Sequence, residues 1–281
     1  MNRESTPEKI NVVALLPELD RMLIKLLGAL STEDWEKQTI APKWKVKDIA
    51  AHLLDGNLRT LSMLRDGYYG EKPENINTYE DLVDFLNRLN ADWVKATQRL
   101  SPEVIINLLE VSGKEYCEYL ATLNLDANAA FPVAWAGENE SKNWFHIARE
   151  YTEKWHHQQQ IRLAVGDEQE LLNEKWYLPY LDTSVRAIPH HYRDIKGSNG
   201  DLVKITFFGR IKKSWYLKYN NKWELLVSIN QTPDCEVKIR DEYAWKIFTK
   251  GIKKEEAIAN SVIIGNQQLG EKIFDMVAVM A

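Results

Sequence analysis

The chain of 281 residues carries 36 basic and 41 acidic side chains, which gives a formal net charge of −5. This near balance excludes a strongly basic surface, so neither a nucleic acid nor an anionic membrane is expected as a partner. Because 44% of the residues are hydrophobic, the chain can bury one large core or two ordinary ones and is not expected to be disordered.

We expect a cytoplasmic protein. Residues 1–10 lack the apolar segment of a signal peptide, and no run of about 18 apolar residues could span a membrane. Cys117 and Cys235 are the only cysteines, and they form neither a disulfide framework nor a zinc pattern. Neither has a base or a metal ligand beside it in the sequence, so both are expected to be bystanders.

Helical periodicity dominates residues 1–165. A first main helix is predicted from about Pro17, and Ser31 is predicted to cap a new helix. Further helices are predicted over about 46–64, 78–98, 102–122 and 141–165. Gly166 fits the C-cap of the last one. Long helices joined by short links are typical of an antiparallel bundle of about four helices.

The pattern changes after Gly166. Helices are predicted over about 174–194, 241–250 and 267–279. Four segments rich in β-branched and aromatic residues are predicted as strands, over 202–208, 214–220, 222–229 and 235–241, with a hairpin turn between the second and third. The predicted fold class is therefore α+β with two domains: a four-helix bundle over 1–166 and an α+β domain with a mainly antiparallel sheet over 171–281.

The last helix of the first half carries one charged stripe. On a helix that turns about 100° per residue, His146, Glu150 and Glu153 lie within about 40° of His157, whereas His156 is rotated away by about 100°. A glutamate and a histidine four residues apart can both point at one ion. Imidazole and carboxylate suit zinc, nickel, iron or manganese, so Glu153 and His157 are candidate metal ligands.

Two ligands do not make a metal site, so a third ligand is needed elsewhere in the chain. His52 is the remaining histidine of the first half outside this helix. It lies at the margin of the apolar face of its own helix, where a bundle could bring it to the edge of a cleft. The alternative stays open, because such Glu–His pairs usually form surface pairs and an isolated histidine is usually just hydrogen-bonded. On that alternative the other histidines are structural or solvated, and Gln158–Gln160 form a solvated polar face.

Several motifs of the chain resemble one family. "WKVKDIAAHLLDG" (44–56) resembles the second-helix motif of DinB-like metal-binding bundles. "FPVAWAGE" (131–138) and "NWFHIAREYTEKWHHQQQIRLAVG" (143–166) resemble the mycothiol-dependent maleylpyruvate isomerase branch of that superfamily. In the second half, "LDTSVRAIPHHYR" (181–193) and the tail from Ile258 resemble the sterol-carrier-like C-terminal domain of these isomerases.

The resemblance implies one divalent metal ion bound by His52, Glu153 and His157, with water at an open position. Zinc is the first candidate, and nickel, iron and manganese are others. The family also implies a low-molecular-weight thiol, for which mycothiol, bacillithiol and glutathione are candidates. No motif locates an arginine for a substrate carboxylate. By residue type alone the candidates are Arg162, Arg186 and Arg240.

The first hypothesis on function is a metal- and thiol-dependent isomerase or S-transferase of the maleylpyruvate isomerase type, acting on a small-molecule electrophile. The metal would activate the thiol by lowering its pKa, and none of the ligand residues would act as a nucleophile. The oligomeric state is left open by the sequence.

Two alternatives remain. In the first, a non-catalytic protein would bind a metal ion that is structural or vestigial in the bundle and an apolar ligand in a cleft of the second half, for which five aromatic residues are candidates: Phe207, Phe208, Trp215, Tyr216 and Trp223. Aromatic residues in strands more simply form the core of the sheet. A metal-assisted hydrolase would activate water at the open position and would need a general base, for which Glu150 is the candidate.

Overall fold

The structure is a computed structural model that describes residues 4–71 and 76–278. The described chain forms two compact units: a helical unit (11–71, 76–130 and 153–168) and a sheet unit (4–10, 131–152 and 169–278). Helix α6 (Asn143–Val165) contributes residues to both. The predicted division into 1–166 and 171–281 remains a prediction, because compactness does not show that a segment folds by itself.

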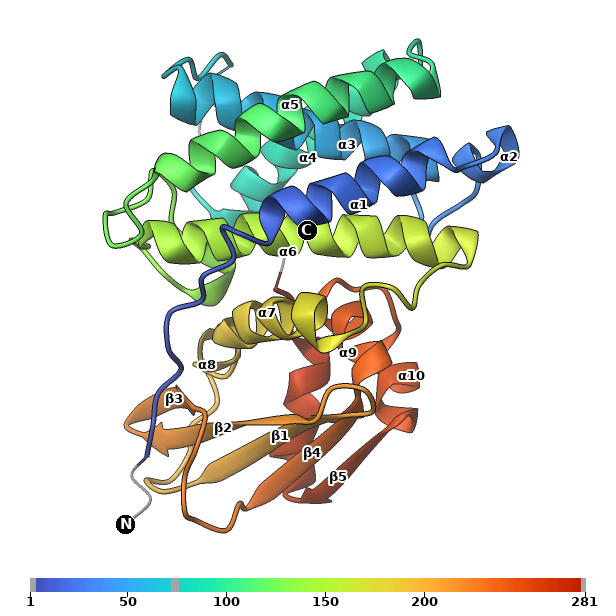
Figure 1. Ribbon diagram of the computed structural model, residues 1–281. Coiled ribbons are helices and arrows are strands. Elements are labelled where there is room, and N and C mark those ends of the chain that lie inside the picture. Colours follow the sequence, from blue (N-terminus) through green and yellow to red (C-terminus); the bar gives the residue numbers. More distant parts are fainter. Residues whose placement is uncertain (1–3, 72–75, 279–281) are drawn as a thin grey trace. The chain divides into compact units, whose positions relative to one another are not determined.

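Four long helices of the helical unit confirm the predicted helical segments to within a few residues. They are α1 (Leu16–Gly28), α3 (Val46–Thr60), α4 (Tyr79–Thr97) and α5 (Pro102–Thr122). Two shorter elements accompany them, α2 (Thr32–Trp35) and a π-helical turn after α3 (Leu61–Arg65). Helix α5 packs against α1 and α3, and α3 packs against α4 (Figure 1). In the part of the chain that the structure describes, no helix is long and apolar enough to cross a membrane.

Side-chain caps fix where several of these helices begin. The hydroxyl of Ser31 accepts a hydrogen bond from the backbone of Asp34, whose carboxylate accepts one from the backbone of Ser31. Thr78 and Asp81 repeat this capping box at the start of α4. Each box satisfies backbone N–H groups that have no partner within the helix. These short-range interactions explain why the starts could be predicted.

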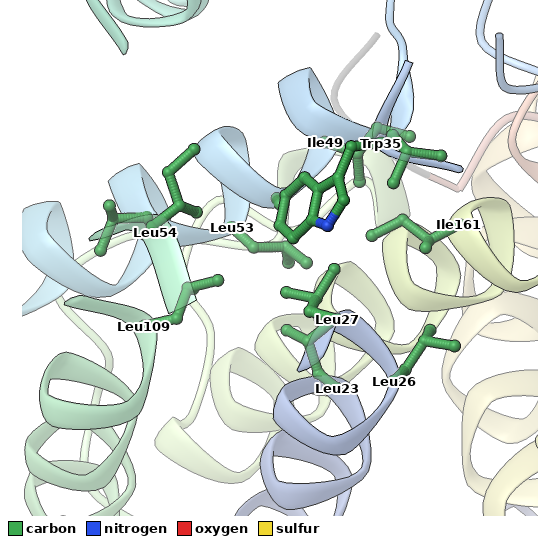
Figure 2. Packing of buried hydrophobic residues seen from close by; sticks show 12 residues of the cluster. Leu23, Leu26, Leu27, Trp35, Ile49, Leu53, Leu54, Leu109 and Ile161 are labelled. Atoms are coloured by element: carbon green, nitrogen blue, oxygen red, sulfur yellow. The ribbon is translucent and has the colours of Figure 1, made fainter. Parts of the chain in front are cut away.

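Aliphatic side chains from four helices form the core of the helical unit (Figure 2). Leu27 of α1, Ile49 of α3, Leu109 of α5 and Ile161 of α6 are at most 1% exposed. Burying such a side chain contributes about 1.5–3 kcal/mol before the entropy cost of ordering it. Ile161 lies one turn after His157 on the same face of α6, so its packing turns Glu153 and His157 toward the interior of the helical unit.

A five-stranded sheet with the order β3-β2-β1-β4-β5 organises the sheet unit. The strands are β1 (Leu202–Phe208), β2 (Lys213–Asn220), β3 (Lys222–Leu226), β4 (Cys235–Arg240) and β5 (Ser261–Gly265). Only β1 and β4 pair in parallel, so the predicted mainly antiparallel sheet is confirmed. Asn221 turns the β2–β3 hairpin with a φ of 60°, a left-handed conformation that asparagine tolerates better than most residues. Helices α9 (Asp241–Phe248) and α11 (Gln267–Glu271) are among those that pack on the sheet.

Three details of the second half differ from the sequence prediction. The helix predicted over 174–194 is broken into α7 (Glu174–Ser184), a 3-10 turn (Val185–Ala187) and α8 (Ile188–His191). Pro189, in the first turn of α8, lacks the N–H that a continuous helix would use. Helix α10 (Lys254–Ala259) and strand β5 were not predicted. Strand β5 is an edge strand whose Val262 and Ile264 are half exposed, so it lacks a buried alternating pattern.

The last predicted helix, 267–279, is shorter in the structure. Helix α11 ends at Glu271 and continues as a 3-10 turn over Lys272–Asp275. The predicted end at residue 279 lies outside the described residues.

Two glycine substitutions should change stability in opposite directions. Gly56 lies inside α3 with open space at its Cβ position, so Gly56→Ala should stabilise the protein by about 0.5–1 kcal/mol. Gly166 ends α6 with a φ of +83°, so Gly166→Ala should destabilise it by about 1–2 kcal/mol although its Cβ meets no atom. Urea unfolding of both variants beside the wild type measures the difference. Equal effects would contradict the assigned backbone conformations.

Candidate metal centre

Two helices of the helical unit bring three potential metal ligands together. His52 lies on α3, and Glu153 and His157 lie one turn apart on α6. One ligand atom from each of the three lies within 4.8 Å of the other two. The Nε2 atom of His157 is 3.5 Å from Oε2 of Glu153, and the ring centroids of His52 and His157 are 4.7 Å apart. The three residues singled out in the sequence are therefore neighbours in space.

Gln160 orients the ring of His157. Its Oε1 atom lies 2.9 Å from Nδ1 of His157. Because an amide oxygen only accepts hydrogen bonds, Nδ1 carries a proton in this contact and the neutral ring keeps its lone pair on Nε2, toward Glu153. A metal-bound histidine is commonly held in this way by a hydrogen bond to its other nitrogen. This role of Gln160 was not predicted from the sequence, where its signal is the spacing of three residues from His157.

The immediate surroundings of His52 are aromatic. The ring centroid of Trp44 lies 4.7 Å from that of His52 and 5.7 Å from that of His157. The Nδ1 atom of His52 is buried and has no hydrogen-bond partner among the described residues. Most buried polar atoms in proteins are hydrogen-bonded. A buried imidazole that has an orphaned nitrogen, and that lies beside a carboxylate and a second imidazole, fits a metal ligand.

Burial and neighbouring charges favour the protonation states that a metal needs. Burial lowers the pKa of His52 well below its usual value, and the positive charge of a protonated His157 would lower it further. Burial alone would raise the pKa of Glu153. A hydrogen bond from a protonated His157, followed by the positive charges of the nearby histidines when they are protonated, outweighs that effect and holds the pKa of Glu153 below its usual range. Burial therefore favours the neutral form of His52, and positive charge beside Glu153 favours its carboxylate form; a neutral imidazole and an ionised carboxylate are the forms that bind metals.

The neighbouring residues on α6 differ from one another in role. His156 is buried but is not among the three residues whose ligand atoms converge in the described structure. The three glutamines are 1%, 0% and 5% exposed, so the alternative of a solvated glutamine face is wrong. Gln159 donates a hydrogen bond to the backbone oxygen of Glu168, 2.8 Å away. The glutamines face protein because α6 is buried on nearly all sides here.

The three candidate arginines have structural partners. Arg162 is 1% exposed and forms an ion pair with Asp167 just beyond the end of α6. The guanidinium of Arg186 lies over the ring of Trp144 and donates hydrogen bonds to two backbone oxygens. Arg240 is largely exposed and pairs with a neighbouring glutamate. These contacts do not support a substrate-carboxylate role for any of the three.

The other candidate residues also have ordinary surroundings. Glu150 lies 2.9 Å from the guanidinium of Arg149, so the candidate general base is part of an ion pair. Burial raises the pKa of Cys117 and of Cys235 to about 11, which keeps both as thiols at neutral pH.

The five aromatic residues proposed for a cleft divide into two groups. Phe207, Trp215 and Trp223 are at most 4% exposed and belong to the core around the sheet, as the simpler interpretation predicts. Phe208 is 38% exposed, and Tyr216 is half-buried on the other face of its strand. Trp223 lines a pocket with residues 189 and 193–196, but the other four aromatic residues do not line that pocket, so the apolar-ligand hypothesis has no cleft built from the five together.

A helical bundle with a His–Glu–His cluster, in one chain with an α+β unit, defines a recognisable class of two-part protein. The sequence profile of the mycothiol maleylpyruvate isomerase N-terminal domain matches residues 16–162, more than half of the chain. The chain therefore belongs to this family, and it is a maleylpyruvate isomerase-like protein. Among curated proteins, none matches the chain.

Solved structures agree in fold. A crystal structure of the mycothiol-dependent maleylpyruvate isomerase superimposes with a TM-score of 0.50 at 11% identity, covering 84% of this chain and 86% of that chain. A crystal structure of a mutant of that isomerase gives a TM-score of 0.46 at 9% identity with the same coverage. At such low identity the first likeness shows a shared fold and the second carries no argument.

The buried histidine upstream on α6 should make stability depend on pH. His146 is 2% exposed, and burial, followed by the charge of Arg149, lowers its pKa to about 4. Between pH 6.5 and about 4 the unfolded chain then binds a proton that the folded protein does not, so stability falls as the pH falls. His146→Gln should remove up to about 1.4 kcal/mol of this loss per pH unit, measured by urea unfolding from pH 7 to 4.5.

The matched control is His190→Gln. His190 is only half-buried, so its replacement should flatten the pH dependence less. Parallel pH profiles for the wild type and His146→Gln would show that His146 titrates normally in the folded protein.

Proposed function

We propose that His52, Glu153 and His157 bind one divalent metal ion, zinc foremost, and that the protein uses it in a thiol-dependent isomerisation or S-transfer. The observation that carries the proposal is the approach of three ligand atoms to within 4.8 Å of one another. Nε2 of His157 and Oε2 of Glu153 are both acceptors in the tautomer that Gln160 favours, and they face each other at 3.5 Å. Two such acceptors repel unless a proton or a cation lies between them.

The donor set fits a catalytic rather than a purely structural ion. Three protein ligands leave a fourth position open, and two imidazoles with one carboxylate are a common catalytic zinc set. An ion held there would supply the Lewis acidity that lowers the pKa of a thiol at the open position. Glu153 contributes the one negative charge of the set, and the neutral rings of His52 and His157 contribute lone pairs. The ring of Trp44 packs beside the two imidazole rings.

The family suggests the thiol and the substrate. We infer that mycothiol is the first thiol to test and maleylpyruvate the first substrate, with bacillithiol and glutathione as the other thiols. In isomerisation the thiolate sulfur adds to an activated carbon–carbon double bond, the resulting single bond rotates, and departure of the same thiolate restores the double bond. In S-transfer the new carbon–sulfur bond remains and a leaving group departs instead. No residue of the triad needs to act as the nucleophile in either case.

Adjacent histidine substitutions separate a ligand from its neighbour. His157→Ala should lower zinc affinity at least about 100-fold, since it removes one of three protein ligands. His156→Ala should change it only a few-fold. Competition with a chromogenic chelator, together with the zinc content after dialysis, measures both. Equal losses of zinc affinity in the two variants would show that the assignment of His157 rather than His156 is wrong. Full zinc affinity in both variants would show that the triad does not bind the metal.

A turnover assay distinguishes the functional hypotheses. Zinc-loaded protein should isomerise maleylpyruvate, or conjugate a halo-aromatic electrophile, only when mycothiol, bacillithiol or glutathione is added, and Glu153→Gln should reduce the rate at least about 100-fold. Turnover without any thiol would support the hydrolase alternative. A protein that binds zinc through His157 and turns over no pair of thiol and electrophile would support a non-catalytic role.

A further inference from the structure

A buried polar network meets α6 one residue away from a proposed ligand. Lys154, which follows Glu153, is 6% exposed. Its ammonium group donates a hydrogen bond to Oδ1 of Asp20 on α1 at 2.9 Å and to Oδ1 of Asn57 on α3 at 2.8 Å. It also lies 4.6 Å from the centroid of the Tyr116 ring on α5. Three directions around this ammonium group are thus occupied by three different helices.

Asn57 and Asp20 are themselves held in place. The side-chain nitrogen of Asn57, which is 1% exposed, donates to the hydroxyl of Ser112 on α5 at 3.2 Å. Asp20 is 8% exposed and lies against Gly113, where an added Cβ would come within 2.2 Å of its Oδ2 atom. A side chain at position 113 would therefore displace the Asp20 carboxylate. The network extends across α1, α3, α5 and α6.

Stability alone does not account for such a network. Removing an ammonium and a carboxylate from water is costly, and well-packed apolar residues in place of a buried ion pair are often as stable or more so. Hydrogen bonds are directional and apolar contacts are not, because a hydrogen bond requires a particular distance and angle. Buried polar contacts are best attested as devices that fix the register of packed helices.

The network lies where register matters most for the three candidate ligands. Lys154 is the residue after Glu153, and Asn57 is five residues after His52, which is about 7.5 Å along the helix axis. A slide of α6 along α3 by a single residue, about 1.5 Å, would lengthen the 2.8 Å bond from Lys154 to Asn57 to about 3.2 Å if the slide is perpendicular to the bond and to about 4.3 Å if it is along the bond, and would tilt it from its present angle, so the bond would weaken or break. The same slide would move Glu153 and His157 relative to His52.

We propose that Lys154 is a positioning residue for the metal centre. Its hydrogen bonds to Asn57 and Asp20 set the register of α6 against α3 that brings Glu153 and His157 to His52. This inference rests on the proposed metal site, and it assigns to Lys154 no contact with the metal or a substrate.

The test separates positioning from stability by a rescued variant. Lys154→Met alone leaves the Asp20 carboxylate buried without its partner and should destabilise the protein. Lys154→Met combined with Asp20→Asn removes both charges and should recover most of the lost stability. In this double variant zinc affinity should still be lower by about 10–100-fold than in the wild type, as is usual when the support of a metal ligand is lost. The cobalt-substituted form should show an altered visible absorption spectrum.

Leu27→Ala is the matched control. Leu27 is 1% exposed in the core of the same unit and takes no part in the network, so its truncation lowers stability without changing the register. Urea unfolding of the metal-free proteins, chelator competition and the cobalt spectrum are measured for all four proteins. Wild-type zinc affinity and spectrum in the double variant would overturn the inference. An equal loss of affinity in Leu27→Ala would overturn it too, because general destabilisation would then explain the effect.

Failure of the metal site itself has a different signature. In that case the wild type and His157→Ala would show the same weak zinc affinity, and both the proposed function and the positioning role would be rejected. Affinity that depends on His157 but not on Lys154 would reject the positioning role alone.

Discussion

The register between α3 and α6 is the constraint on which the candidate centre depends. Glu153 and His157 share a face of α6 through helical geometry alone, because residues four apart lie one above the other. His52 comes from a different helix, so nothing local brings it to them. Apolar contacts such as those of Ile161 favour burial of the helix, but they are non-directional and tolerate small slides. The hydrogen bond from Lys154 to Asn57 joins the same two helices and is weakened or broken by such a slide, because it depends on distance and angle.

Without a bound cation, the centre would contain interactions that oppose folding. A buried imidazole with an orphaned nitrogen and a carboxylate facing a second imidazole are each less well satisfied than they would be in water. The surrounding core and the hydrogen bond that His157 donates to Gln160 hold these groups in place in spite of this cost. Binding of a cation would relieve it, so ligand binding and stability are coupled at this site. Such a locally unfavourable arrangement on rigid helices is common at functional sites.

How far the sequence could predict the molecule depends on the range of each interaction. The starts of α2 and α4 follow from the capping residues Ser31 and Thr78, which act within three residues. The pair Glu153 and His157 follows from helical periodicity, whereas His52 was selected by exclusion and by family resemblance. The role of Lys154 could not be predicted, because Asn57 lies 97 residues away in the sequence and a lysine in a helix is ordinarily taken to face solvent.

The misplaced elements have similar explanations. Strand β5 presents Val262 and Ile264 half exposed at a sheet edge, so it has no buried alternation to detect. The helix predicted over 174–194 has suitable periodicity, but Pro189 interrupts its hydrogen bonds. A run of three glutamines is polar, so in the sequence alone it is readily interpreted as a solvated helix face. The sequence does not show which other helices pack against it. The burial of these glutamines is a property of the surrounding helices.

The stripe of α6 contains an internal comparison that supports a cation at Glu153 and His157. His146 and Glu150 are also a histidine and a carboxylate four residues apart, with Nδ1 and Oε1 separated by 4.0 Å. There the guanidinium of Arg149 lies 2.7 Å from the histidine nitrogen and 2.9 Å from the carboxylate, and it supplies the positive charge that the two acceptors need.

The second pair has no such residue. In the described part of the chain no lysine or arginine forms an ion pair with Glu153, and the adjacent Lys154 is directed to Asp20 and Asn57. The third group at this pair is the imidazole of His52, which burial keeps neutral. The two pairs therefore have the same spacing on one helix but different surroundings. Arg149 neutralises His146 and Glu150, whereas in the described residues no lysine or arginine pairs with Glu153 and His157. This difference in surroundings, rather than the spacing, distinguishes the proposed metal ligands from the structural pair before them.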